Sequence, residues 1–198
     1  PYRTREQLSR LYCRKPWAEL SGAQRAEFLA FADDHFRIVH RTYEDGAQHH
    51  LKWLQSTIYA LAVRDECKLI LVDPWNELEH LPEPGESLTA YINWGIQQIR
   101  VWAEQFDCHI CLIAHPRKMN TDGKPRCPTG YDIADSAAFF NKPALGFSVH
   151  KGQTDDGEDF VEVQTWKVRE TQLYGFSPGS IRLKFHDHGM TYSRFEDN

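Results

Sequence analysis

The sequence lacks any apolar run approaching the roughly 18 residues that a membrane-spanning helix needs. It also lacks an excess of basic residues, because the formal net charge is −5 and the pI is near 6.1. A protein that coats nucleic acid is normally basic, so any such contact must come from local patches. The chain is not poor in apolar residues: 41% of its 198 residues are hydrophobic and 26% are charged. These values exclude a disordered chain and predict one globular domain with a sizeable core.

Cysteines are few and odd in number, which does not suggest a disulfide framework. Cys108 and Cys111 are three apart on a predicted strand, so they point to opposite faces and cannot jointly hold a metal. The charged first residues are not typical of a secretory signal. We therefore expect reduced thiols in a cytoplasmic protein. The five cysteines are Cys13, Cys67, Cys108, Cys111 and Cys127.

The sequence also contains no G-x-x-x-x-G-K-[ST], the loop whose backbone N–H groups cradle phosphates in many nucleotide hydrolases. Its single Gly-Lys pair, Gly123-Lys124, is followed by Pro125. A phosphate-binding loop of this type cannot be built from the chain as given.

The stretch from Lys68 to Val72 is a short, almost unbroken apolar run that ends in Asp73. This pattern predicts a strand buried on both faces, as in the parallel sheet of an α/β protein. Pro74 cannot donate a ladder hydrogen bond, so the strand should end there. A carboxylate at this end of a parallel strand can hold Mg²⁺ through its water shell. Asp73 could equally be an ordinary turn or helix-capping residue.

A second apolar strand, predicted at 109–114, ends in the same way at His115. The carboxyl ends of neighbouring parallel strands share one ligand crevice, so Asp73 and His115 are paired candidates for catalysis. A neutral imidazole there could sense a terminal phosphate, although a hydrogen-bonded structural histidine is also compatible with the pattern. Asn76 and Glu77 are further candidates; Glu77 could act as a base or form an ion pair with the following loop.

Lys167 and Arg169 end a strand predicted from residue 160. Because they are two apart, their side chains should point to the same face. They could form an arginine finger with a helper cation that reaches a phosphoryl group. Basic residues on a solvated edge strand, which discourage aggregation, are the simpler interpretation of the spacing.

A polar loop from Arg117 to Gly130 holds a concentration of basic residues in this acidic protein. Its prolines, glycines and cations suit a loop that follows a phosphate backbone, although solvated basic loops are common. The candidate contacts to nucleic acid are Arg117, Lys118, Lys124, Arg126 and Lys142.

The remaining pattern alternates helix and strand and then becomes strand-rich. This order predicts an α/β fold: a mostly parallel central sheet flanked by helices, with an antiparallel, strand-rich C-terminal extension. Ser21 and Gln24 have the spacing of a capping box at a helix start. The helices are predicted at 4–12, 21–33, 51–63, 87–106 and 132–141, and the further strands at 36–40, 145–150, 160–168 and in a hairpin at 180–192.

Four stretches, in this order, resemble the RecA-like helicase domain of the Twinkle and phage primase–helicase group, most closely its DnaB-like members. They span 71–80, 113–118, 131–142 and 167–169. The resemblance covers most of the chain from about residue 50 and implies a partial RecA-like domain. It implies an ATP-dependent, replicative-type DNA helicase of phage or bacterial origin that works as a hexameric ring on single-stranded DNA. ATP or another NTP and Mg²⁺ would be its cofactors, and a primase could be a partner.

The resemblance also implies a role for each matched residue. Asp73 matches the Walker B carboxylate that positions Mg²⁺. His115 matches the residue that senses the γ-phosphate. Lys167 and Arg169 match the cations that act in trans on the nucleotide of a neighbouring subunit.

Two segments, 117–130 and 131–142, match the loops that line the channel for single-stranded DNA. Ala134-Asp135-Ser136 departs from the Ser-Gly-Ser usual in the family and adds a negative charge there. The family's phosphate-binding strand and its water-activating glutamate should precede residue 1. We therefore expect residues 1–198 to be one RecA-like domain truncated on its N-terminal side and inactive as an ATPase by itself.

Two other interpretations stay open. The chain could be a non-catalytic RecA-like module that binds DNA or a partner protein without a phosphate-binding loop. It could also be a metal-dependent hydrolase or nuclease that uses Asp73, Glu77 and His115.

Overall fold

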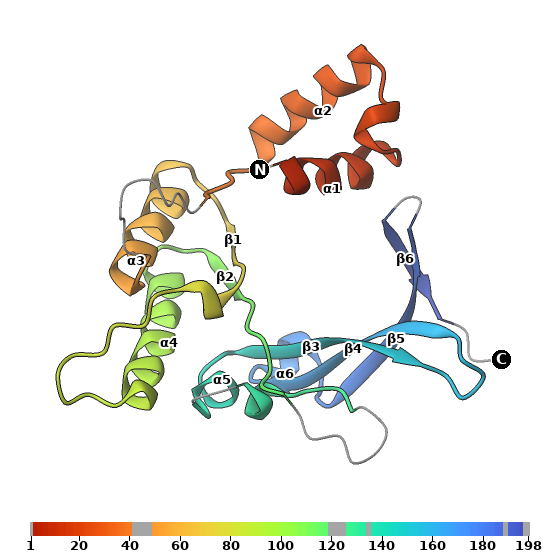
Figure 1. Cartoon of the computed structure of the whole chain (residues 1–198). Helices are drawn as coiled ribbons and strands as arrows, with labels where there is room; N and C mark the ends of the chain where they lie inside the picture. The colour runs from red at the N-terminus through yellow and green to blue at the C-terminus, as the bar shows by residue number, and fades with distance from the viewer. Residues whose placement is uncertain (1, 41–48, 119–125, 134–135, 188–189, 196–198) are drawn as a thin grey trace. The chain divides into compact units, whose positions relative to one another are not determined.

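The structure is a computed structural model, and its description covers most of the chain (Figure 1). The described residues are 2–40, 49–118, 126–133, 136–187 and 190–195. They form two compact units, which we describe separately. One unit comprises Pro1–His40, Lys151–Val163 and Ile181–Asn198, and the other comprises Arg41–His150 and Gln164–Ser180. Within the described part of the chain, no helix combines the length and apolar character needed to cross a membrane.

The first unit begins with two helices, α1 (Tyr2–Cys13) and α2 (Gly22–His35), joined by a 3₁₀ turn (Trp17–Glu19). The predicted capping box of α2 is confirmed: Gln24 N–H donates to Ser21 Oγ (3.3 Å), and Ser21 N–H donates to Gln24 Oε1 (3.1 Å). Phe28, 1% exposed, packs against the rings of Tyr12 and Trp17 at 6.0 Å. These three rings form the apolar centre of the helix pair.

The prediction of a strand at 36–40 is wrong. The chain leaves α2 at Phe36 and continues without pairing to any described strand. Phe36, Ile38 and Val39 are 40%, 46% and 50% exposed. Apolar residues alone do not make a strand, because its backbone N–H and C=O groups need a partner.

The second unit contains a parallel pair of strands, β1 (Leu69–Val72) and β2 (His109–Leu112), in which Val72 lies opposite Leu112. Two helices pack on this pair: α3 (Leu51–Tyr59), which continues as a π-helical turn (Ala60–Arg64), and α4 (Leu88–Gln105). Figure 1 shows α3 and α4 together beside β1 and β2. The apolar faces of these four elements form the core, as the sequence predicted. Its most buried members are Leu51, Leu54, Ile58, Ile70, Trp75, Ile92, Ile96, Ile99 and Trp102.

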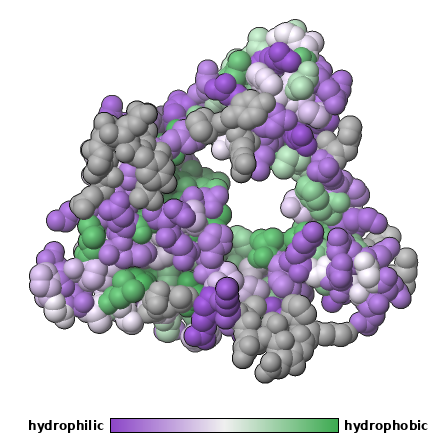
Figure 2. All heavy atoms as spheres, viewed as in Figure 1, coloured by the Kyte–Doolittle hydropathy of each residue, from purple (hydrophilic) through white to green (hydrophobic). Residues whose placement is uncertain are grey.

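The predicted burial of β1 on both faces is wrong for the described chain. Ile70 and Val72 are 5% and 9% exposed, whereas Leu69 and Leu71 are 68% and 58% exposed. The reason is that the described sheet has two strands and its helices cover the Ile70 side. Figure 2 shows hydrophobic atoms at the surface over the β1–β2 pair.

An antiparallel sheet occupies the C-terminal third, in the order β3-β4-β5-β6. Its hairpin is confirmed, since Phe185 of β5 lies opposite Tyr192 of β6. Between β2 and β3, the predicted helix 132–141 is shorter than expected: a 3₁₀ turn (Gly130–Asp132) precedes α5 (Ala138–Asn141). The strands span β3 (Leu145–Gln153), β4 (Asp159–Val168), β5 (Gly179–His186) and β6 (Thr191–Arg194), with α6 (Thr171–Tyr174) between β4 and β5. A parallel sheet with helices followed by an antiparallel, strand-rich part confirms the predicted fold class.

Candidate functional site

The carboxyl ends of β1 and β2 remain joined beyond the strands. Ile113 N–H donates to Val72 O at 2.9 Å, and Trp75 N–H donates to Ile113 O at 2.7 Å. Asn76 Oδ1 accepts a hydrogen bond from His115 N–H at 2.8 Å. The structure thus brings the segments of Asp73, Asn76 and His115 to one end of the parallel pair, where open α/β sheets bind ligands.

Trp75 holds this arrangement in place. It is 2% exposed, and its ring contacts Phe139 and His80 at centroid distances of 5.9 and 4.9 Å. Because this ring anchors the 3₁₀ turn Trp75–Glu77, its polar neighbours Asp73, Asn76 and Glu77 stay on the outside. The turn therefore exposes the side-chain oxygen atoms of its polar residues, because the apolar Trp75 between them is buried.

Asp73 is an exposed carboxylate, and an ionised carboxylate can only accept hydrogen bonds. It therefore fits a role in which Mg²⁺ is held through its water shell. No group of three or more His, Cys, Asp or Glu side chains positioned to bind a metal occurs among the described residues. Asp73 is thus an exposed carboxylate at this end of the parallel pair, outside any such group among the described residues.

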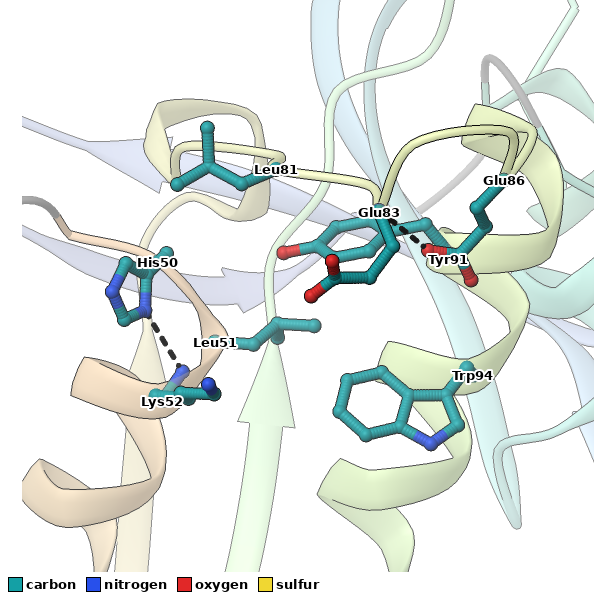
Figure 3. A pocket seen from close by; sticks show the side chains of 8 residues that line it. All are labelled: His50, Leu51, Lys52, Leu81, Glu83, Glu86, Tyr91 and Trp94. Atoms are coloured by element: carbon teal, nitrogen blue, oxygen red, sulfur yellow. Dashed lines mark hydrogen bonds between the residues drawn. The ribbon is translucent and has the colours of Figure 1, made fainter.

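A pocket of about 390 Å³ lies in the same unit, beside the N-terminal turns of α3 and α4 (Figure 3). The loop before α4 closes one side of it, and Ser87 caps that helix by accepting from Ala90 N–H at 3.2 Å. None of the site residues predicted from the sequence lines this pocket. Its lining residues are His50, Leu51, Lys52, Leu81, Glu83, Glu86, Tyr91 and Trp94.

Lys167 and Arg169 both reach the end of α5. Lys167 Nζ donates to the carbonyls of Phe140 (2.6 Å) and Asn141 (2.7 Å). Arg169 Nη2 donates to the carbonyls of Asn141 (3.0 Å) and Lys142 (3.3 Å). The two cations share a face, as their spacing predicted. They satisfy carbonyls that have no partner within the helix.

Lys167 is half-buried in this position. Burial, followed by the nearby positive charges of Arg169 and Arg100, lowers the pKa of its ammonium group. The carbonyls of Phe140 and Asn141 in α5 and of the following Lys142 are the hydrogen-bond acceptors of these two neighbouring cations.

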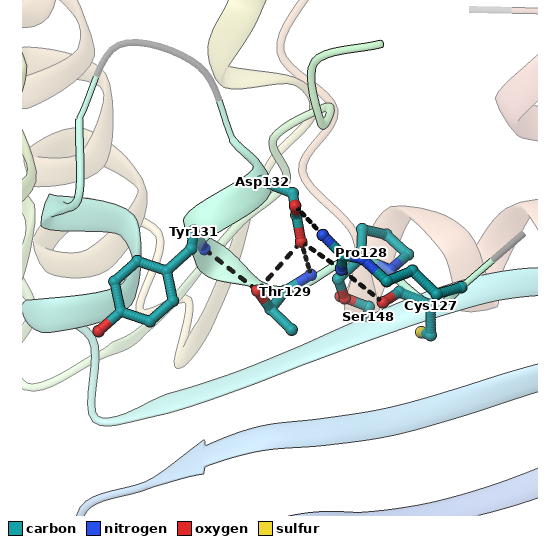
Figure 4. A network of polar contacts seen from close by, with 7 residues as sticks. Cys127, Pro128, Thr129, Tyr131, Asp132 and Ser148 are labelled. Atoms are coloured by element: carbon teal, nitrogen blue, oxygen red, sulfur yellow. Dashed lines mark hydrogen bonds and ion pairs between the residues drawn. The ribbon is translucent and has the colours of Figure 1, made fainter. Parts of the chain in front are cut away.

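Asp132 is the centre of a network of polar contacts that includes Arg126, near the C-terminal end of the basic segment; Figure 4 shows this network. Both terminal nitrogens of Arg126 donate to the carboxylate of Asp132. Thr129 donates to the same carboxylate from its N–H at 2.7 Å and its hydroxyl at 3.1 Å. These bonds, led by the one from Arg126, lower the pKa of Asp132, which is 5% exposed, to about 2. Arg126 therefore has a structural role here that the sequence prediction did not include.

The other basic candidates have different surroundings. Arg117 N–H donates to Asp132 O at 2.9 Å, which places the backbone of Arg117 next to the 3₁₀ turn; Arg117 and Lys118 are both exposed. Lys142 Nζ donates to Gln97 Oε1 of α4 at 3.1 Å. Lys124 lies outside the described residues, as does Asp135, one of the family departures.

An aromatic column beside the basic loop was missed by sequence reasoning. Tyr131 stacks on Phe140 at 3.9 Å between centroids, and Phe140 stacks on Trp166 at 5.3 Å. The three rings come from a turn, a helix and a strand, so no sequence spacing connects them. Only the small residues Gly130 and Gly146, which face the Trp166 ring, could have hinted at close packing.

Comparisons with known proteins agree with this architecture, although no family model matches the chain. Over 162 residues (70% of the chain), it is 28% identical to the chloroplastic/mitochondrial Twinkle homolog protein of Arabidopsis thaliana. The chain spans 23% of the length of that protein.

Two solved structures share the fold. A DnaB-like replicative helicase, solved in a study of its interactions with primase, superposes with a TM-score of 0.71 and 13% identity, over 98% of this chain and 49% of that one. A solved ATPase domain superposes with a TM-score of 0.70 and 14% identity, over 98% of this chain and 71% of that one.

Proposed function

We propose that this chain, which has the RecA-like fold of DnaB-like helicase domains and resembles Twinkle in sequence, is the C-terminal part of an ATP-dependent replicative DNA helicase. The observation that carries the proposal is the joined end of β1 and β2. There, Asp73 and His115 follow neighbouring parallel strands, and Asn76 links the two segments. In the intact protein, subunits form a hexameric ring, nucleotides bind between neighbours, and single-stranded DNA passes through the channel.

Asp73 would hold Mg²⁺ through its water shell, and Mg²⁺ there would neutralise part of the phosphate charge of ATP. His115, whose backbone N–H is held by Asn76, would sense the terminal phosphate through its imidazole. Arg169 of the neighbouring subunit stabilises the charge that develops as water attacks in line. An arginine finger of this kind contributes about 10³–10⁵ in rate.

The finger role requires Arg169 to leave the carbonyls of Asn141 and Lys142. Arg169 is exposed, so water can replace it at these two carbonyls, which it holds through hydrogen bonds of 3.0 and 3.3 Å. Lys167 stays closer to α5 and acts as the helper cation.

The chain contains no G-x-x-x-x-G-K-[ST], so the proposed ATPase needs a phosphate-binding loop that these residues do not supply. We expect the 198-residue chain by itself not to hydrolyse ATP. A second candidate is a RecA-like module that binds DNA or a partner without hydrolysis. A nuclease using Asp73, Glu77 and His115 has less support, because the described chain holds no cluster of metal ligands.

Mixed rings of the intact protein test the proposal. Asp73→Asn and Arg169→Ala should each abolish DNA-stimulated ATP hydrolysis while leaving nucleotide binding largely intact. In a ring mixed from equal amounts of the two variants, about one quarter of the interfaces combine a native Asp73 with a native Arg169 across neighbours. We expect about one quarter of the native rate if the interfaces act independently.

Lys68→Ala is the control, because Lys68 lies at the opposite end of β1 and pairs with exposed Asp107. It should hydrolyse ATP at the native rate. Full activity of Arg169→Ala would contradict the finger, and absence of recovery in mixed rings would contradict its action in trans. If the native protein bound DNA but never hydrolysed ATP, the second candidate would replace the helicase.

A further inference from the structure

The aromatic column of Tyr131, Phe140 and Trp166 ends at the surface. Tyr131 is 55% exposed, and one face of its ring lies nearly parallel to Phe140, at 15°. Phe140 in turn lies at 22° to Trp166. Figure 4 shows the Tyr131 side chain pointing away from the polar network around Asp132. Among the described residues, Phe140 is the ring on which Tyr131 stacks, and the exposure of Tyr131 leaves area for a further planar group.

The column is held rigidly at its inner end. Trp166 Nε1 donates to Ser148 Oγ at 3.1 Å, and Ser148 Oγ donates to Pro128 O at 2.6 Å. A Cβ atom at Gly146 would lie 2.1 Å from the indole, and one at Gly130 would lie 2.7 Å from it. Glycine at both positions lets the backbone approach the indole and fixes its place.

The outer end is fixed as well. Tyr131 N–H donates to Thr129 Oγ1 at 3.4 Å, and Asp132 ties the turn to Arg126. Because the aromatic column is already fixed at both ends, it loses little conformational freedom when a ligand binds. More of the contact energy then contributes to the binding free energy.

Cationic residues lie near the inner part of the column and beside the turn that carries Tyr131. Lys167 Nζ lies 5.6 Å from the Phe140 centroid, and the backbone of Arg117 is bonded to Asp132. Arg117 and Lys118 are exposed, and the one buried carboxylate of the turn is neutralised by Arg126. An exposed aromatic face with exposed cationic residues on a neighbouring segment suits single-stranded nucleic acid, in which a ring can stack on a base and cations can hold phosphates.

We propose that Tyr131 is a base-stacking residue, whose outer face takes an unpaired base of single-stranded DNA while Arg117 and Lys118 contact the adjoining phosphates. This inference rests on the proposed function. That function requires only contacts to the phosphate backbone of DNA, and the inference adds a contact to its bases. Stacking of this kind tolerates any base, because every base has a π-face.

Binding of fluorescent 20-nucleotide single strands to the intact protein tests the proposal. Tyr131→Ala should weaken binding at least about 10-fold, whereas Tyr131→Phe and Tyr131→Trp should stay within about 3-fold of native. The new indole of Tyr131→Trp should be quenched by DNA. Tyr174→Ala is the matched control, because Tyr174 is 61% exposed in the same unit but outside the column.

An oligonucleotide whose bases are replaced by abasic sites separates stacking from a structural effect. The native protein should bind it more weakly, and Tyr131→Ala should bind it as the native protein does. Equal affinity of the native and Tyr131→Ala proteins for normal DNA, or an equal loss on normal and abasic DNA, overturns the proposal. If the native protein bound no single-stranded DNA even at low salt, the proposed function itself would be wrong.

Discussion

Replacing Asp132 by asparagine should remove a buried charge that organises the basic loop. The carboxylate is 5% exposed and accepts four hydrogen bonds, from Arg126 and Thr129. An asparagine side chain keeps the shape but turns one acceptor oxygen into a donor, which faces N–H groups already aimed at it. The partner Arg126 is more than half exposed and can return to water. The loss of folding stability in Asp132→Asn should therefore come from the missing carboxylate and not from a buried, unpaired Arg126.

The pKa of Asp132 gives the magnitude and the sign of its contribution to the free energy of unfolding. It is lowered from 3.8 to about 2 in the folded state. At about 1.4 kcal/mol per unit, the folded state gains about 2.4 kcal/mol at neutral pH. Because the folded pKa is the lower one, this stabilisation is complete above about pH 5 and is lost as the pH falls towards 2.

Urea unfolding followed by tryptophan fluorescence from pH 2 to pH 7 measures this difference. At pH 7, Asp132→Asn should lower the unfolding midpoint by about 1 M, and the difference from native should shrink below pH 4. Asp107→Asn is the control, because Asp107 forms an ion pair with Lys68 at 2.7 Å but its side chain is 94% exposed. Its effect should be much smaller. A loss for Asp132→Asn that is equal at pH 2 and pH 7, or a similar loss for Asp107→Asn, would refute the reasoning.

Two further predictions concern packing. Gly146→Ala places a methyl group against the indole of the aromatic column and should cost about 1–3 kcal/mol, measured as a loss of unfolding free energy. Gly22→Ala, where nothing lies within 4 Å, should cost nothing measurable, and a similar loss at both glycines would contradict the packing. Ile58→Ala, in a fully buried position of α3, should cost about 2–5 kcal/mol. Leu71→Ala should cost far less because its side chain is 58% exposed; equal costs would mean that β1 is covered on both faces.

The local patterns of the sequence predicted most of the fold correctly. The apolar runs before Asp73 and His115 are adjacent parallel strands, as predicted. A short apolar run without polar alternation that is ended by proline is typical of a strand in a parallel sheet. The capping box at Ser21 formed because it needs only residues within one turn. Lys167 and Arg169 share a face because side chains alternate along a strand.

The predictions were wrong where strand pairing or burial depends on residues distant in the sequence. The segment 36–40 is apolar enough for a strand but has no strand to pair with, and Leu69 is exposed because the described helices cover the other face. Burial and pairing are properties of the assembled fold, so a local pattern cannot fix them.

The candidate site shows the same limit. Arg126 was predicted as a nucleic-acid contact because it lies in a basic loop, but its ion pair with Asp132 depends on how that loop closes. Tyr131 and Trp166 are 35 positions apart and meet only through α5. Such contacts can be inferred from chemistry only after the backbone has been placed.

On the proposed function, α5 connects the nucleotide interface to the DNA loop through one residue. Lys167 Nζ donates to the carbonyl of Phe140, and the ring of the same residue carries Tyr131. Arg169 holds the next carbonyls, and burial, followed by the charge of Arg169, lowers the pKa of Lys167. A phosphate arriving from a neighbouring subunit would draw Arg169 away and relieve this repulsion, so Lys167 would bind the Phe140 carbonyl more firmly. The base-stacking ring should therefore be held most firmly when nucleotide is bound, and DNA affinity should rise with nucleotide in the native protein but not in Lys167→Gln.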